Sequence, residues 1–255
     1  MLHVSPWDIA LAMGISLQAT VLAYVYNPRW KALLMNLPIP FTISALALGK
    51  AIDVTNVEGL FLLFLFTHVV RLLYVKWRWP IVLAIVSSAL LYCGLSYVLS
   101  LVTPRTDAAF WSVSVLLFGL GALMYMLTPY RQEPGHRTTL PVWIKSPIIV
   151  GVVAFVVVVR RVLEGFMTVF PMVGVIAAYE ARHSLYTMCR QMSIVLLTLT
   201  PLMATCRLTQ AWLGLSRALA VAWLVFVICL TAMTRLTDRR DAAIRRSMPE
   251  TERVP

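Results

Sequence analysis

The chain has 255 residues, of which 60% are hydrophobic and only 13% are charged, and its mean hydropathy is +0.82. Apolar stretches near the ~20 residues that cross a bilayer recur along the whole length, which excludes a soluble globular domain. They are too numerous for one secretory signal peptide, and they lack the short alternating segments of a membrane β-barrel. We therefore expect an all-α, polytopic transmembrane helical bundle.

Hydropathy predicts nine membrane-spanning helices, which we number in chain order. Their ranges are 7–26, 37–52, 58–76, 80–102, 108–128, 144–162, 166–182, 191–206 and 211–234. The second and eighth predicted spans are short and contain Pro38, Pro40 and Pro201. Neighbouring helices or a cavity must satisfy the backbone groups that these prolines free.

Lysine and arginine are distributed unequally between the two sides that nine spans create. One side carries sixteen of them and the other six, namely Lys50, Arg105, Arg160, Arg161, Arg207 and Arg217. The positive-inside rule puts the larger set in the cytoplasm, with the N-terminus outside and the C-terminus inside a bacterial-type inner membrane. The net charge of +11 then fits anionic lipids at the cytoplasmic face as partners and requires no nucleic acid.

A basic segment, residues 235–255, follows the last predicted span. Asp241 and Arg245 are four residues apart, which favours a helix that continues past the membrane. Two interpretations stay open for this tail: a solvated basic anchor, or a docking site for a partner. A homo-oligomer is also compatible with the sequence.

The residue types that bind metals or attack substrates are scattered along the chain. No CxxC pair occurs and the four histidines show no ligand spacing; the cysteines are Cys93, Cys189, Cys206 and Cys229. No Gly-rich phosphate loop and no GxSxG or HExxH motif is present. We therefore expect no metal, no cofactor and no enzymatic activity.

An internal repeat is indicated by a shift of 111 residues. Three charged positions fall on residues of like charge: Lys50 on Arg161, Asp53 on Glu164 and Arg71 on Arg182. The pattern predicts a parallel tandem repeat of four spans each, and chance similarity is the alternative. The predicted parts are an extra N-terminal span and loop (1–36), a first repeat (37–128), a cytoplasmic linker (129–143), a second repeat (144–234) and a basic cytoplasmic tail (235–255).

The stretch "FPMVGVIAAY", residues 170–179, carries a family resemblance. It is similar to the Phe-Pro-x-x-x-x-Ile-Ala-x-Tyr stretch that follows a short polar loop in small four-helix inner-membrane proteins of the GlpM type. The first half has "LFLLFLFTHVV" at the matching place, without the Phe-Pro. The resemblance implies a helical inner-membrane protein associated with exopolysaccharide production, and it carries over no catalytic residue.

Charged residues inside or beside the spans are the candidate site residues. Lys50 with Asp53, and Arg161 with Glu164, are spaced i,i+3. They are either screened charges in short external loops or partly buried ion pairs near the extracellular mouth, one in each half.

A second group of charges lies at the predicted cytoplasmic end. Glu180 follows an almost uncharged run, and two positions later Arg182 points to another helix face, so we expect Glu180 to face the interior. A membrane-edge cluster, a structural ion pair and a proton-coupled or cation site all remain open. His68 lies three residues before Arg71, either as a packed, hydrogen-bonded histidine or as a titrating relay.

Two classes of function remain for a chain with so little mass outside the membrane. The leading hypothesis is a permease or channel-like protein for a small solute or ion. The competing one is a non-transporting accessory or assembly component, for example in exopolysaccharide production. Polar residues within the spans are few, which counts against a transporter of polar solutes; they include Thr67, Ser87, Ser88, Ser96, Thr198 and Thr200.

Overall fold

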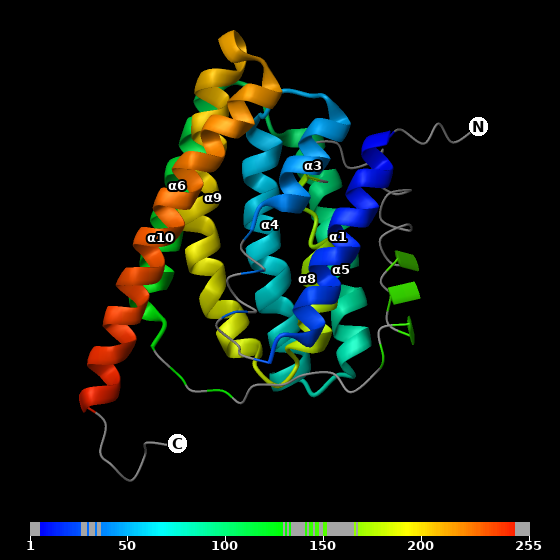
Figure 1. Cartoon of the computed structure of the whole chain (residues 1–255), viewed down its shortest axis with the longest axis vertical. Helices are drawn as coiled ribbons and strands as arrows, with labels where there is room; N and C mark the ends of the chain where they lie inside the picture. Colours follow the sequence, from blue (N-terminus) through cyan, green and yellow to red (C-terminus); the bar gives the residue numbers. More distant parts are fainter. Residues whose placement is uncertain are drawn as a thin grey trace.

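The computed structural model describes residues 6–26, 30, 34, 37–129, 131, 133, 141, 143–144, 146–147, 150–151, 166 and 168–247. Within these residues the chain forms α-helices and no strand, as the sequence predicts (Figure 1). The helices are α1 (Pro6–Tyr24), α3 (Ile39–Leu48), α4 (Val54–Arg71), α5 (Ile81–Val102), α6 (Asp107–Leu127), α8 (Met172–Glu180), α9 (Leu185–Leu213) and α10 (Leu215–Ser247). A π-helix, η1 (Leu72–Lys76), continues α4.

Five of these helices are long and apolar enough to cross a membrane, which fits an integral membrane protein. They are Val54–Lys76, Ile81–Val102, Asp107–Leu127, Leu185–Leu213 and the part of α10 from Leu215 to Ile244. They correspond to the third, fourth, fifth, eighth and ninth predicted spans. The eighth is longer than the predicted 191–206, because α9 extends past both predicted ends, from Leu185 to Leu213, to a length of 29 residues.

The second and seventh predicted spans contain only short helices. α3 has 10 residues and α8 has 9, which at a rise of about 1.5 Å per residue is roughly half of the ~30 Å hydrocarbon core. α3 begins after Pro38 and ends at Gly49, whose φ of 63° is left-handed. α8 begins after Pro171 and ends where the chain turns at Ala181. The predicted count of nine full-length helices is therefore not confirmed.

The sixth predicted span, 144–162, lies almost entirely outside the described residues. The same gap leaves the tandem repeat a prediction, because it removes most of the segment that would match α3. The 111-residue shift brings α4 and η1 onto residues 165–187, where the described helix is α8 with its 9 residues. The similar charges of the two proposed repeats are therefore not accompanied by helices of equal length, since α4 with η1 has 23 residues and α8 has 9.

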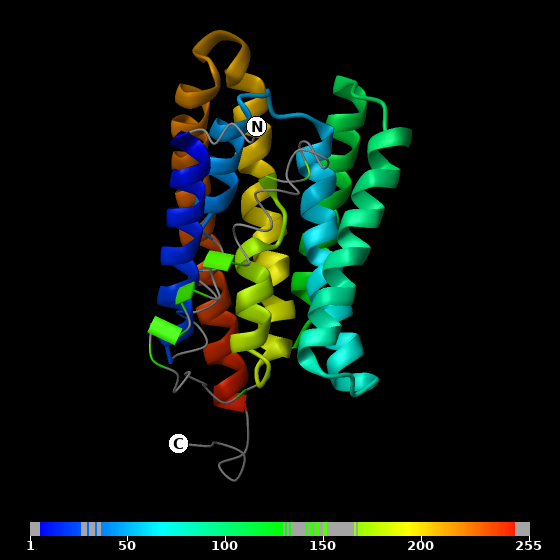
Figure 2. The same cartoon turned by 90° about the vertical axis from the view of Figure 1, so that its right-hand side faces the viewer.

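The described connections 49–53, 77–80, 103–106, 181–184 and that between α9 and α10 lie at the two ends of the bundle. Residues 49–53, residues 103–106 and the turn between α9 and α10 lie at the upper end of Figure 1, where α1 begins. The connections 77–80 and 181–184 lie at the lower end, where α10 finishes (Figures 1 and 2). The described chain therefore starts at one end and finishes at the opposite one.

α4 and α9 form the centre of the bundle, and α5, α6 and α10 form its outside. In the apolar windows of α4 and α9, 50% and 67% of residues are buried, against 28%, 22% and 17% in the other three. The outer helices expose large apolar side chains such as Leu101 and Leu116, at 70% and 71%. Such continuous apolar surface fits contact with lipid.

Gly121 sets the close approach of α6 to α9. A Cβ added at Gly121 would lie 2.9 Å from Cβ of Leu196, whereas a Cβ at Gly119, two residues earlier, would meet nothing within 4 Å. We expect Gly121→Leu to lower stability by about 1–3 kcal/mol through overpacking. Gly119→Leu is the matched control and should change stability by less than about 0.5 kcal/mol. Thermal unfolding of both variants in detergent checks this, and equal losses would contradict the α6–α9 contact.

Candidate functional site

A cavity of about 70 Å³ lies between α3, α4, α8 and α9. At roughly 30 Å³ for each water molecule in the liquid, it holds about two waters. The side chains that line it are apolar except for those of Thr67 and Thr168, and none of the described residues that line it is charged. It is the point at which the two short helices come together.

Both short helices begin at this cavity. Pro38 precedes α3 and Pro171 precedes α8, and neither proline nor any other side chain caps the helix start with a described hydrogen bond. The N–H groups of the first helical turn have no partner within their own helix, and they form the positive end of the helix dipole. Phe41, Val173 and Gly174 carry such N–H groups and line the cavity.

A chain of hydrogen bonds connects the cavity wall to the start of α4. Asp53 Oδ1 accepts from the backbone N–H of Thr55 at 2.9 Å, and the side chain of Asn56 accepts from the backbone N–H of Asp53 at 2.8 Å. Asn56 Nδ2 also donates to Thr168 Oγ1 at 2.8 Å. This capping box satisfies two free N–H groups of α4 and fixes the Thr168 hydroxyl.

The predicted pair Lys50 and Asp53 lies at the upper end, in the non-helical connection between α3 and α4. The two residues do not share a helix, because Asp53 is the extended N-cap residue of α4, so their position in a short connection fits the first of the two alternatives. Both residues line a smaller cavity of about 20 Å³ together with Arg105 and Thr168. The matching residues Arg161 and Glu164 lie outside the described residues.

Glu180 is the last residue of α8 and is only 3% exposed, so its predicted interior position is confirmed. Arg182 lies in the turn that follows. Its Nη1 donates to the backbone oxygen of Tyr179 at 3.1 Å, and its guanidinium lies 4.9 Å from the centre of the Tyr179 ring. Arg182 thus terminates α8, as expected for a cation at a helix C-terminus.

His68 and Arg71 lie in the last turns of α4. His68 Nδ1 lies 2.8 Å from the backbone oxygen of Phe64, which favours the packed, hydrogen-bonded interpretation. The Arg71 guanidinium lies 4.9 Å from the centre of the Tyr186 ring on α9. The structure therefore puts Arg71 in a contact between two central helices, at the end opposite Lys50 and Asp53.

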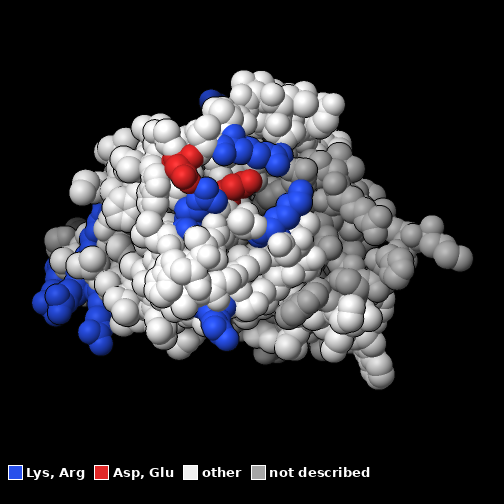
Figure 3. Space-filling model, turned by 90° about the horizontal axis from the view of Figure 1, so that it is seen from above, with Lys and Arg blue, Asp and Glu red and all other residues white. Residues whose placement is uncertain are grey.

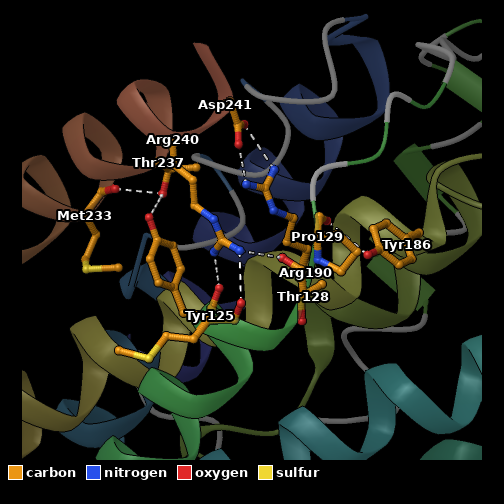
Figure 4. Close-up of polar contacts among 10 residues, drawn as sticks. Tyr125, Thr128, Pro129, Tyr186, Arg190, Met233, Thr237, Arg240 and Asp241 are labelled. Atoms are coloured by element: carbon orange, nitrogen blue, oxygen red, sulfur yellow. Dashed lines mark hydrogen bonds and ion pairs between the residues drawn. The ribbon is translucent and has the colours of Figure 1, made fainter. Parts of the chain in front are cut away.

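A polar cluster that sequence reasoning missed joins α10 to α6 and α9 at the lower end (Figure 4). Arg190 donates from Nη1 and Nη2 to the two carboxylate oxygens of Asp241, at 3.1 and 2.5 Å, and the two side chains are 14% and 6% exposed. Arg240 donates to backbone oxygens at the end of α6: Tyr125, Met126 and Thr128. The tail is helical as far as Ser247, as predicted, and Asp241 reaches a partner on another helix.

Glu58 is a second residue that sequence reasoning missed. It lies in the second turn of α4 and is 8% exposed. Oε1 accepts from Thr103 Oγ1 at 2.7 Å, while Oε2 is buried without a hydrogen-bond partner among the described residues. An unsatisfied buried carboxylate oxygen is costly. In the sequence, Glu58 could have been identified as a lone acidic residue in the largely apolar run "VTNVEGLFLLFLF".

Comparisons with protein-family models, with curated proteins and with solved structures found no match to this chain. The resemblance to GlpM-type proteins therefore stays a prediction.

The buried Arg190–Asp241 pair should contribute to stability far more than the exposed Arg207–Asp107 pair. The Asp107 side chain is 72% exposed, against 6% for Asp241. We expect Asp241→Asn to destabilise by about 3 kcal/mol, since it leaves a guanidinium in a buried place without its anion. Asp107→Asn, the same change at the other end, should cost about 0–1 kcal/mol. Thermal unfolding in detergent measures both, and equal shifts would show that burial does not distinguish the pairs.

Proposed function

We propose that the protein is a permease or channel-like protein for a small solute, whose pathway includes the cavity between α3, α4, α8 and α9. The observation that carries this proposal is that two short helices, α3 and α8, begin at the same cavity. Irregular backbone at membrane depth is tolerated where it is buried in protein or lines a water-filled space. Several transporters bind substrate at such interrupted helices near the middle of the membrane.

The chemistry of the cavity wall favours a small uncharged or anionic solute over a cation. The wall offers two hydroxyl groups and the N–H groups of the first turns of α3 and α8, and no carboxylate among its described residues. Helix starts attract negative partial or full charge. The limited volume of about 70 Å³ favours a solute of few atoms unless the helices move apart.

The topology that accompanies this proposal has nine passes, of which the second and seventh are only partly helical. In it the upper end of Figure 1 faces outward and the basic lower end faces the cytoplasm and its anionic lipids. The tandem repeat and a homo-oligomer are compatible with this arrangement. Neither is needed for a pathway between α4 and α9.

A non-transporting accessory component is the second candidate. The small size of the cavity favours it, as does the apolar surface that α5, α6 and α10 expose, which could receive a partner helix as well as lipid. The resemblance to GlpM-type proteins points to exopolysaccharide production for this role. A flux measurement separates the two candidates.

In reconstituted liposomes, we expect the protein to raise the flux of at least one solute from a panel of glycerol, urea, acetate and chloride. Thr67→Val should reduce that flux, because it replaces one of two cavity hydroxyls by a methyl group of equal size. The matched control is Thr198→Val. Thr67 and Thr198 are 1% and 0% exposed and donate to the backbone oxygen four residues earlier, at 3.1 and 2.8 Å, but only Thr67 lines the cavity.

Stopped-flow light scattering gives the flux, and protein-free liposomes give the baseline. Flux at baseline for every solute would favour the accessory component. Equal flux in the two threonine variants would remove the cavity from the pathway. Glu58→Gln and Glu180→Gln, measured in the same liposomes, report whether either buried carboxylate takes part in ion coupling.

The proposed orientation can be tested by labelling single cysteines, in a background without the four native ones. Lys50 and Arg217 are exposed at one end, and Lys76 and His183 are exposed at the other. We expect a membrane-impermeant maleimide to label cysteines at 50 and 217 from the outside of the inner membrane, and those at 76 and 183 only after permeabilisation. The reverse pattern would invert the orientation, and a mixed pattern would contradict the grouping of connections.

A further inference from the structure

A larger groove, of about 600 Å³, opens at the upper end of the bundle, where the α3–α4 connection, the start of α6 and the end of α9 meet. Its volume lies in the range of roughly 300–1,000 Å³ typical of ligand sites. Seen from above, this end has acidic side chains lying among basic ones (Figure 3). The polar side chains of the groove are Asp107, Arg207 and Gln210, and its apolar ones include Trp111, Leu208 and Leu215.

Among the described residues, the groove contains one cation, Arg207, and one anion, Asp107, and each can bind another partner. Arg207 donates to Asp107 Oδ1 from Nε and Nη2, at 3.1 and 2.5 Å, and to the backbone oxygen of Ile52 from Nη1, at 3.0 Å. A guanidinium has five N–H groups, so two remain after these contacts with described residues. Asp107 makes its contacts through Oδ1 and its side chain is 72% exposed, against 27% for Arg207.

The polar wall of the groove is held in place by Gln210. Its Oε1 accepts from the backbone N–H of Ile52 at 2.8 Å, and its Nε2 donates to the backbone oxygen of the same residue at 3.0 Å. Because Arg207 bonds to that oxygen as well, the α3–α4 connection is fixed to α9 at one residue. The charged pair therefore stands on a prearranged surface, which lowers the entropic cost of binding.

We propose that this groove binds the headgroup of a zwitterionic phospholipid that carries phosphate and a primary ammonium group, as in phosphatidylethanolamine. The phosphate binds the remaining N–H groups of Arg207, and the ammonium binds Asp107. The glycerol and upper acyl chains lie along Trp111 and Leu208, of which Leu208 is 63% exposed. Tryptophan at the end of a membrane-spanning helix marks the headgroup level, which places the charged pair where such headgroups are.

Charge complementarity selects this occupant. A purely anionic headgroup would meet the carboxylate of Asp107 beside Arg207, and like charges repel. A choline headgroup has no N–H to donate to the carboxylate. A soluble phosphate compound would leave the apolar side of the groove exposed to water. The proposal concerns the end of the molecule opposite the basic tail and does not depend on transport.

The test is lipid binding by purified protein in detergent, measured by native mass spectrometry. The probes are dioleoyl phosphatidylethanolamine, dioleoyl phosphatidylglycerol, dioleoyl phosphatidylcholine and the soluble O-phosphoethanolamine. We expect wild-type protein to retain phosphatidylethanolamine in preference to the other three. Asp107→Asn should abolish the preference for phosphatidylethanolamine over phosphatidylglycerol, because it removes the partner of the ammonium and the repulsion of the anion together. Arg217→Gln, an exposed cation of the same end outside the groove, should leave the preference unchanged.

Three results would overturn the proposal. Equal binding of O-phosphoethanolamine and the lipid would identify a soluble ligand. Equal retention of the three lipids by wild-type protein would identify nonspecific annular contact. An unchanged preference in Asp107→Asn would remove the carboxylate from recognition. The melting temperature of Asp107→Asn in detergent reports whether the variant is folded, and Arg207→Gln, which should lose all three lipids, provides a second variant of the same site.

Discussion

Backbone N–H and C=O groups outside the long helices must find hydrogen-bond partners in apolar surroundings. The other features of this structure depend on this constraint. A backbone N–H or C=O without a partner costs several kcal/mol in hydrocarbon. The short helices α3 and α8, and the non-helical residues beside them, must therefore lie inside protein. α4 and α9 provide that interior, because they are continuous, long and the most buried of the spanning helices. The cavity at the starts of α3 and α8 is the remaining space between these four elements.

Polar side chains of α1, α5 and α9 form hydrogen bonds with backbone groups in the segments between the named helices. Tyr92 on α5 donates to the backbone oxygen of Phe166 at 2.8 Å. Gln18 on α1 donates to the backbone oxygen of Leu34 at 2.7 Å. Gln210 on α9 bonds both backbone groups of Ile52. The hydrogen bonds of these three side chains hold connections in place. Backbone N–H groups and two threonines remain as the polar groups of the cavity between α3, α4, α8 and α9.

The sequence predicted the long outer helices almost to the residue: 80–102 and 108–128 against Ile81–Val102 and Asp107–Leu127. Their composition is uniformly apolar, and hydropathy measures that directly. Hydropathy failed for α3 and α8, since a window average does not register that α3 ends at Gly49 or that α8 begins only after Pro171. It shortened α9, because Arg190 and Arg207 lower the average inside a continuous helix.

Site prediction failed for a different reason. Helical spacing finds partners within one helix, and Asp241 was therefore compared with Arg245, although its partner Arg190 is 51 positions away. Glu58 is the first residue of the predicted span 58–76, and hydropathy does not single it out. Only the structure shows that its Oε1 accepts from Thr103, while its Oε2 has no hydrogen-bond partner among the described residues. The interior position of Glu180 could be predicted, because a carboxylate after a long apolar run has few other places that satisfy it. The partners of the other site residues are set by contacts between segments that lie far apart in the sequence, which helical spacing does not show.

Burial gives different roles to the ion pairs Arg190–Asp241 and Arg207–Asp107, although both join an arginine of α9 to an aspartate of another helix. The side chains of Arg190 and Asp241 are 14% and 6% exposed and make two parallel hydrogen bonds, so loss of either one would leave the other charge largely buried without this partner. Arg207 binds a single oxygen of Asp107, whose side chain is 72% exposed, so the pair is weak and leaves each ion able to bind a second partner. A buried bidentate pair suits a fixed joint between α9 and α10. An exposed pair beside a groove with apolar walls suits ligand recognition. Each ion can bind a second charged group and keeps its first partner when the ligand displaces water.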